Sequence, residues 1–144
     1  MANWYGTART NYVTLTDAEQ VNRIISAFGT TMHQESESCT RTDGKYAFFP
    51  NRDSDGDFDY YMFDDDGDDI EFVWEDIMPF VAEGEVLVVI VSGAEKSRYI
   101  TGDAQAYCRK GDDIMSTGVA LTDIYAKAAL SFDVPLGSMT VAEY

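Results

Sequence analysis

Six consecutive aliphatic residues, Val86–Val91 (VLVVIV), form the longest apolar run of the chain. The run has the length and β-branched content of a buried strand, and it is far shorter than the roughly 20 apolar residues of a membrane-spanning helix. Turn residues at Ser92–Lys96 and a long segment ending near Cys108 follow it. The pattern therefore predicts a central strand with an antiparallel return strand, in which Gly102 is typical of a β-bulge.

The segment Thr16–Gly29 (TDAEQVNRIISAFG) has the start and stop signals of an α-helix. Thr16 as N-cap and Glu19 three residues later match a capping box, and Gly29 supplies a left-handed end. Four apolar residues recur at i, i+3, i+4 and i+7 and form one buried stripe: Val21, Ile24, Ile25 and Phe28.

Alternating polarity and turn residues predict further elements along the chain. The expected strands are Thr10–Thr16, a polar edge strand at Thr31–Ser38, Gly44–Pro50, Asp57–Phe63 paired with Gly44–Pro50 as a hairpin, and Ile114–Ser116. A short helix within Ile70–Gly84 and a closing helix at Leu121–Phe132, capped by Thr122, complete the set. We expect a single α+β domain spanning residues 1–144, a mostly antiparallel sheet with two or three helices packed on it.

The charge of the chain is strongly negative and unevenly distributed. Its 26 acidic residues outnumber 10 basic ones, giving a net charge of −16, and twelve of the acids lie between Asp53 and Asp76. Such a charge disfavours direct contact with nucleic acids and anionic membranes and attracts basic partners. The N-terminus lacks the basic and apolar regions of a signal peptide, and the two cysteines are too few for a disulfide framework, so we expect a cytoplasmic protein.

The acidic tract resembles the first half of a calcium-binding EF-hand loop. Four oxygen-bearing residues take loop positions 1, 3, 5 and 9 when the loop begins at residue 51: Asn51, Asp53, Asp55 and Asp59. Gly56 takes position 6, but position 12 is Met62, where the loop needs a bidentate glutamate. A calcium- or cation-binding domain is therefore an alternative interpretation rather than the leading one.

Catalytic signatures are weak in this sequence. His33 is the only histidine, and neither Cys39 nor Cys108 belongs to a CxxC pair. A zinc site or a histidine-dependent triad has too few residues to form, and no glycine-rich phosphate loop occurs. We expect no enzymatic activity, no catalytic residue and no cofactor.

The spacing of the first acidic cluster favours an interaction surface. Asp53, Asp55, Asp57 and Asp59 alternate along the chain. In an extended strand such residues share one side and recur every 6–7 Å, which is comparable to the spacing of nucleic-acid phosphates. A second cluster follows around Gly67. The predicted partner-binding residues are Asp53, Asp55, Asp57, Asp59, Tyr61, Asp64, Asp65, Asp66, Asp68, Asp69 and Glu71.

Three segments resemble a group of small, acidic, functionally uncharacterised bacterial proteins carried on plasmids and phages. They are NWYGTARTNY near the start, GEVLVVIVSGAEKSRYITGDAQA in the middle and TVAEY at the end. The resemblance implies an α+β fold and a mobile-element setting, in which small acidic proteins often act as anti-restriction or anti-CRISPR DNA mimics. The leading hypothesis is an acidic protein that blocks a basic, nucleic-acid-binding protein, and the alternative in the same surface class is an immunity protein that neutralises a basic toxin.

Overall fold

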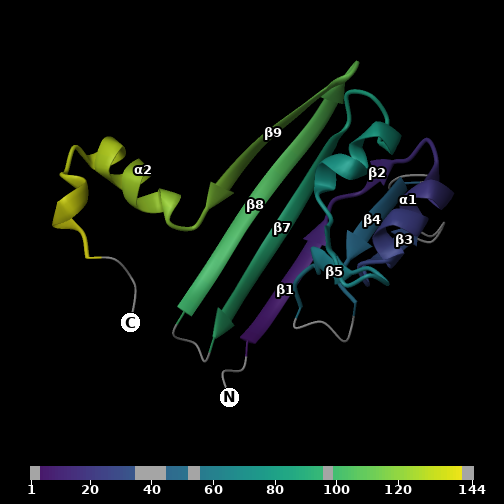
Figure 1. The fold of residues 1–144 in the computed structure, drawn as a ribbon. Coiled ribbons are helices and arrows are strands. Elements are labelled where there is room, and N and C mark those ends of the chain that lie inside the picture. The colour runs from purple at the N-terminus through teal and green to yellow at the C-terminus, as the bar shows by residue number, and fades with distance from the viewer. Residues whose placement is uncertain (1–3, 35–44, 52–55, 96–98, 141–144) are drawn as a thin grey trace.

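The computed structural model describes residues 4–34, 45–51, 56–95 and 99–140. They form an α+β arrangement of antiparallel sheets, which confirms the predicted fold class. Figure 1 shows long strands crossing the molecule, with α1 and the smaller strands gathered on one side. The strands are β1 (Trp4–Thr10), β2 (Val13–Thr14), β3 (Thr31–Gln34), β4 (Lys45–Phe49), β5 (Tyr61–Phe63), β6 (Asp69–Glu71), β7 (Val86–Glu95), β8 (Tyr99–Lys110) and β9 (Asp113–Ala120).

The largest sheet has the strand order β1-β7-β8-β9, and all its pairs are antiparallel. The aliphatic run lies in β7, an interior strand, and its return strand is β8, as predicted. The turn prediction at Ser92–Lys96 is wrong, because β7 continues to Glu95. The bulge prediction is also wrong, because Gly102 pairs with Ser92 in unbroken register. A side chain at Gly102 would instead crowd Leu121, whose Cδ1 atom lies 3.0 Å from the ideal Cβ position.

The first helix, α1 (Ala18–Ser26), confirms the predicted apolar stripe, since Val21 and Ile25 are fully buried. The predicted cap is wrong by one residue. The Asp17 carboxylate accepts the Gln20 amide hydrogen at 2.9 Å, whereas the Thr16 hydroxyl donates to the carbonyl of Phe80. The helix is followed by Gly29 at φ +70°, the left-handed conformation expected there.

The three-stranded sheet has the order β2-β4-β3. Both sides of β4 are occupied, so the predicted pairing of Gly44–Pro50 with Asp57–Phe63 is wrong, and β5 pairs with β6 instead. The predicted strand Thr10–Thr16 is divided between the two sheets, because the Asn11 side chain bonds the Val86 carbonyl and the Val88 amide. The polar edge strand is confirmed over Thr31–Gln34, and the rest of that prediction lies outside the described residues.

Aromatic side chains join the sheets at the core. The Trp74 ring lies edge-on to Phe58 at 4.9 Å and to Phe72 at 5.1 Å between ring centroids. The helix predicted within Ile70–Gly84 is present as two 3-10 turns, η1 (Trp74–Asp76) and η2 (Met78–Phe80). Pro79 in the second turn has no backbone N–H, so it cannot donate the hydrogen bond that a continuous α-helix through both turns would need.

The C-terminal part of the chain leaves the core. Strand β9 is longer than predicted, and the helix α2 (Asp123–Phe132) and the turn η3 (Leu136–Ser138) follow it. The α2 helix begins after Thr122 as predicted, although the Thr122 side chain makes no capping hydrogen bond. No residue of α2 is buried, and Figure 1 shows α2 beyond the end of β9, on the far side of the sheet from α1. Among the described residues, no helix is long and apolar enough to cross a membrane.

Candidate functional site

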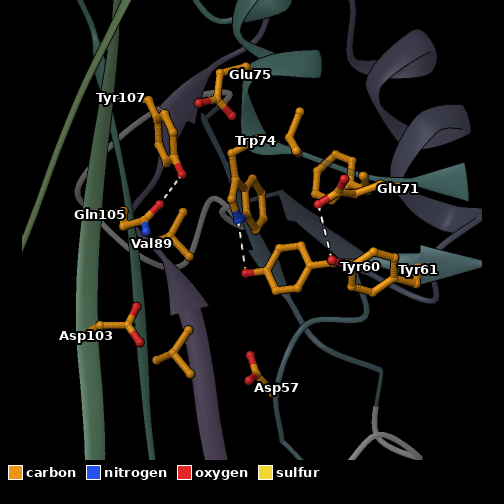
Figure 2. A pocket seen from close by; sticks show the side chains of 13 residues that line it. Asp57, Tyr60, Tyr61, Glu71, Trp74, Glu75, Val89, Asp103, Gln105 and Tyr107 are labelled. Carbon is orange, nitrogen blue, oxygen red and sulfur yellow. Dashed lines mark hydrogen bonds between the residues drawn. The ribbon is translucent and has the colours of Figure 1, made fainter. Parts of the chain in front are cut away.

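A pocket of about 460 Å³ lies between the long strands and the aromatic segment that follows the acidic tract. Figure 2 shows side chains from both walls pointing into it. The residues that line the pocket are Asp57, Tyr60, Tyr61, Glu71, Phe72, Val73, Trp74, Glu75, Val89, Val91, Asp103, Gln105 and Tyr107.

Strand β8 supplies one wall through alternation. Asp103, Gln105 and Tyr107 stand at i, i+2 and i+4 and therefore share one side of the strand. Their partners on β7 are the apolar residues Val91, Val89 and Leu87, so the polar side chains lie next to an apolar strand. The Tyr107 hydroxyl donates a hydrogen bond to Oε1 of Gln105. This contact turns the Tyr107 ring toward Gln105, which lies between Tyr107 and Asp103 on the same side of β8.

Aromatic residues build the opposite wall. Trp74 is 3% exposed, and its indole Nε1–H donates to the Tyr60 hydroxyl at 3.3 Å. The neighbouring Tyr61 hydroxyl donates to Oε1 of Glu71, also at 3.3 Å, across the β5–β6 pair. These bonds fix ring edges and one carboxylate at the pocket mouth (Figure 2).

Gly56 determines where the acidic segment meets the sheet. Its φ is +91°, and a Cβ atom there would clash with the carbonyl of Gly6 in β1. Only glycine allows this close approach of two backbones. The next residue, Asp57, is thereby placed at the pocket, where its carboxylate accepts the Phe58 amide hydrogen at 2.7 Å.

The pKa values of three pocket residues are raised, mainly by burial and to a smaller extent by neighbouring negative charge. Burial raises the pKa of Asp57, and the nearby Asp103 and Asp59 raise it further. Burial likewise raises the pKa of Tyr60, with added repulsion from Asp57 and Asp103. Burial and the charges of Glu75, Tyr60 and Asp103 raise the pKa of Tyr107 to about 12. The repulsion from neighbouring acids, which is the smaller cause of each shift, shows that the local potential is negative, and a negative potential attracts a cation.

The composition of the lining supports this preference. Asp57, Glu71, Glu75 and Asp103 supply four carboxylates, and no lysine or arginine is present among the described lining residues. Trp74 and the tyrosines add aromatic rings, which attract organic cations. The pocket therefore has the chemistry of a receptor for a guanidinium or ammonium group.

The β5–β6 hairpin continues the pocket mouth onto the surface. Its register places Tyr61 opposite Glu71 and Phe63 opposite Asp69, so aromatic and acidic side chains share one side. Tyr61 is 67% exposed and Phe63 is 73% exposed. Large aromatic side chains at this exposure are typical of protein-binding surfaces.

The tip of the hairpin uses one of its carboxylates for folding. Oδ1 of Asp64 accepts the amide hydrogens of Asp66 and Asp68 at 2.9 and 2.8 Å. Gly67 adopts φ +86° to complete the turn. Asp64 therefore stabilises the turn, while four acids remain exposed around it: Asp65, Asp66, Asp68 and Asp69.

The structure brings together only part of the predicted binding set. Asp57, Tyr61 and Glu71 line the pocket. Asp59 lies elsewhere, with Oδ2 3.7 Å from the ideal Cβ position at Gly29. The predicted phosphate-like repeat is not seen in the described part of the tract, because residues 56–60 form no strand. Asp53 and Asp55 lie outside the described residues.

Sequence reasoning missed the β8 side of the pocket. Asp103, Gln105, Tyr107 and Glu75 were not among the predicted residues. The alternation of Asp103, Gln105 and Tyr107 with alanines is a signal in the sequence that these three side chains share one side of a strand. Nothing in the sequence indicated that this side would lie opposite Tyr60 and Trp74.

The residues of the calcium alternative are only partly described. Asn51 and Asp59 both lie beside Gly29, while Asp53 and Asp55 belong to the undescribed segment 52–55. Within the described ranges, no group of three or more His, Cys, Asp or Glu side chains is arranged to hold a metal ion. Of the two cysteines, Cys108 is free, and Cys39 lies outside the described part of the chain.

Comparison with known proteins gave no match to any family model, curated protein or solved structure.

Proposed function

We propose that this protein is a non-enzymatic acidic interaction protein that binds and blocks a basic, nucleic-acid-handling protein. The pocket receives a lysine or arginine side chain of that partner, and the β5–β6 hairpin provides the surrounding contact surface. The observation that carries this proposal is the pocket itself, in which four carboxylates and several aromatic rings surround a space with no described basic residue.

Arginine fits the chemistry of this pocket best. Its planar guanidinium donates paired hydrogen bonds to carboxylates and stacks on aromatic rings. Asp57 and Asp103 provide acceptors, and Tyr60 and Tyr61 provide ring surface. The hydrogen bond from the buried Trp74 indole holds the Tyr60 ring in place. Arginine and aromatic residues also dominate the binding energy of many protein interfaces. A single inserted arginine would therefore anchor the complex.

The remaining acidic residues act at longer range. The exposed acids of the hairpin tip and the net charge of −16 accelerate encounter with a positively charged partner. Proteins that bind nucleic acids carry positively charged surfaces, because their lysines and arginines neutralise phosphates. The resemblance to plasmid- and phage-borne acidic proteins points to restriction enzymes and CRISPR effector complexes as the first partners to test.

The direct experiment is capture of candidate partners by the immobilised full-length chain, measured against a panel of restriction nucleases and CRISPR effector complexes. The pocket variant Asp57→Asn/Asp103→Asn removes two carboxylates without changing side-chain size. We expect it to weaken capture at least tenfold, and raising the salt concentration to weaken capture by the unmodified chain. The control variant Asp112→Asn/Asp133→Asn removes the same charge from exposed positions outside the pocket and should reduce capture only slightly.

Equal capture by the pocket and control variants would contradict a specific role for the pocket and leave only general charge attraction. Binding of duplex DNA by the isolated chain would contradict the proposal as a whole. The immunity-protein alternative has the same surface chemistry and predicts capture of a basic toxin in place of the nucleases. The calcium alternative predicts micromolar calcium affinity by calorimetry together with a rise in melting temperature.

A further inference from the structure

The second unusual surface of the molecule is apolar and lies away from the acidic tract. Among the described residues, most of the exposed large hydrophobic side chains lie on β7, β8, β9 and the segment that follows β9. On the sheet, five of them share the outer side of the strands: Val86, Ile90, Ile100, Met115 and Val119. The segment after β9 adds Leu121, Ile124, Leu130, Phe132, Val134 and Leu136. Monomeric proteins seldom expose so many neighbouring apolar groups.

Part of this surface is the outer side of the main sheet, the side that faces away from the pocket and core. Register places Val86, Cys108 and Met115 in one row across the three strands, and Ile90, Ala104 and Val119 in another. None of these six residues is charged, although the chain has a net charge of −16; the second row continues in β1 to the exposed Arg9, which pairs with Ile90. An apolar hollow of about 260 Å³ lies along the first row, lined in part by Val86, Cys108 and Met115.

The other part is the C-terminal arm, residues 121–140, which contains α2 and η3. Leu130 is 87% exposed and Phe132 is 75% exposed, and α2 contributes no buried residue to the described fold. A helix as short as α2 normally gains its stability by packing its apolar side against another element. The arm therefore carries the helix layer that the outer side of the sheet lacks.

Strand β9 has an open edge that a second protein chain could approach. It is the last strand of the sheet, so one of its edges has no strand beside it in the described fold. Its sequence, DIMSTGVA, contains no lysine or proline, the residues by which edge strands commonly resist association. The arm begins at the next residue, Leu121, and α2 begins at Asp123, so the arm follows directly on this open strand.

We propose that the chain forms a two-fold symmetric homodimer in which the C-terminal arm of each protomer packs on the outer side of its partner's sheet beside β9. One chain holds both the uncovered sheet and the helix suited to cover it. A second copy satisfies both at once, as an isologous interface requires.

Charge and area both favour a second copy over a different partner. Two acidic chains repel each other least where they carry little charge, and this surface carries little. The two pockets stay free, because they lie on the opposite side of the sheet. The exposed apolar side chains amount to on the order of 1,000 Å² per chain, against about 800 Å² that each partner buries in a standard stable interface.

Sedimentation of the full-length chain at several protein concentrations tests the proposal. We expect a mass of twice 16.0 kDa, with a dissociation constant that high salt leaves unchanged or lowers, because screening removes repulsion between like-charged protomers. The variant Leu130→Glu/Phe132→Glu should shift the dissociation constant at least a hundredfold toward monomer. Its melting curve at low protein concentration should match that of the unmodified monomer, because both side chains are exposed in the protomer.

Two further variants keep the result interpretable. Val119→Glu, on the sheet side of the interface, should produce the same monomer. Phe63→Glu makes the same chemical change at a residue 73% exposed on the hairpin and should leave the dimer intact. A monomeric unmodified chain, including one whose arm is protected from hydrogen exchange by folding onto its own sheet, would overturn the proposal. A dimer that survives both arm and sheet variants would overturn it as well.

Discussion

The pocket region and the C-terminal arm differ in how their aromatic and apolar side chains are used. Around the pocket, Trp74 is buried, hydrogen-bonded and in contact with two other rings. The pocket acids lie around this packed aromatic cluster. In the arm, Phe132 is mostly exposed and the helix carries little charge. The pocket region presents carboxylates suited to a basic partner. The arm presents apolar surface suited to an association that salt does not weaken.

The largest contrast should appear on truncating one aromatic residue in each region. Trp74→Ala removes a buried ring from the core and should lower the free energy of unfolding by about 3–5 kcal/mol. Phe132→Ala, measured at a protein concentration where the chain is monomeric, should change it by less than about 0.5 kcal/mol. Denaturant titration measures both. A large loss in the Phe132 variant under those conditions would mean that the arm packs within its own protomer.

The attachment of the acidic segment to β1 can be tested at its glycine. Gly56→Ala forces a side chain into both a positive φ and the Gly6 carbonyl, so we expect a loss of at least about 1–3 kcal/mol and weaker partner capture as Asp57 moves. Gly67→Ala is the matched control, since Gly67 has φ +86° but no atom within 4 Å of its ideal Cβ position. Equal losses of stability in the two variants would show that the close approach of the Gly56 and Gly6 backbones does not contribute to the effect of Gly56→Ala.

Glu85 provides a carboxylate with satisfied partners, unlike those of the pocket. It accepts hydrogen bonds from the amide and hydroxyl of Thr14 and pairs with Lys45 at 3.2 Å. Burial alone would raise the pKa of Glu85, but these partners hold it below its ordinary value of 4.5. Glu85→Gln should therefore cost about 1–2 kcal/mol at neutral pH.

Because the pKa of Glu85 is lower in the folded state, its contribution is present above pH 4.5 and is lost as the pH falls through the folded pKa. Unfolding curves of the two proteins should therefore converge at acidic pH. A constant difference across the acidic range would contradict the assignment of the stabilisation to the ionised carboxylate.

The smallest effect is expected at Asp57 and has the opposite sign. Its pKa is raised above 3.8 by burial and neighbouring acids, so the ionised form destabilises the fold as the pH rises through the folded pKa. Asp57→Asn should raise the free energy of unfolding at neutral pH by about 0.5 kcal/mol or less, because solvent screens a half-exposed carboxylate. The gain should vanish below pH 3.8 in melting experiments, while partner capture weakens. Destabilisation at neutral pH would mean that the carboxylate is held by stronger contacts than its Phe58 amide.

Local sequence signals predicted α1 and β7 because each is determined by its own periodicity. The Val21–Phe28 stripe specifies a helix face, and Val86–Val91 specifies a buried strand whatever surrounds it. The N-cap was displaced to Asp17 because the Thr16 hydroxyl found a partner in Phe80, which is 64 residues distant. Strand pairing was mispredicted for Asp57–Phe63 because β4 is flanked by β2 and β3, a choice made by long-range contacts.

The sequence by itself determined that the chain is acidic, that the acids cluster around aromatic residues, and that its main elements are antiparallel strands with a few helices. Charge, hydrophobic periodicity and turn residues are local properties, so they can be read along the chain. Only the tertiary structure decided that Asp103 and Tyr107 stand opposite Tyr60 and Trp74, and that the C-terminal helix leaves its own core. Both depend on strand register and on packing between residues far apart in sequence, which no local pattern encodes. The acidic tract is consequently one wall of a two-sided pocket, and β8 supplies the other.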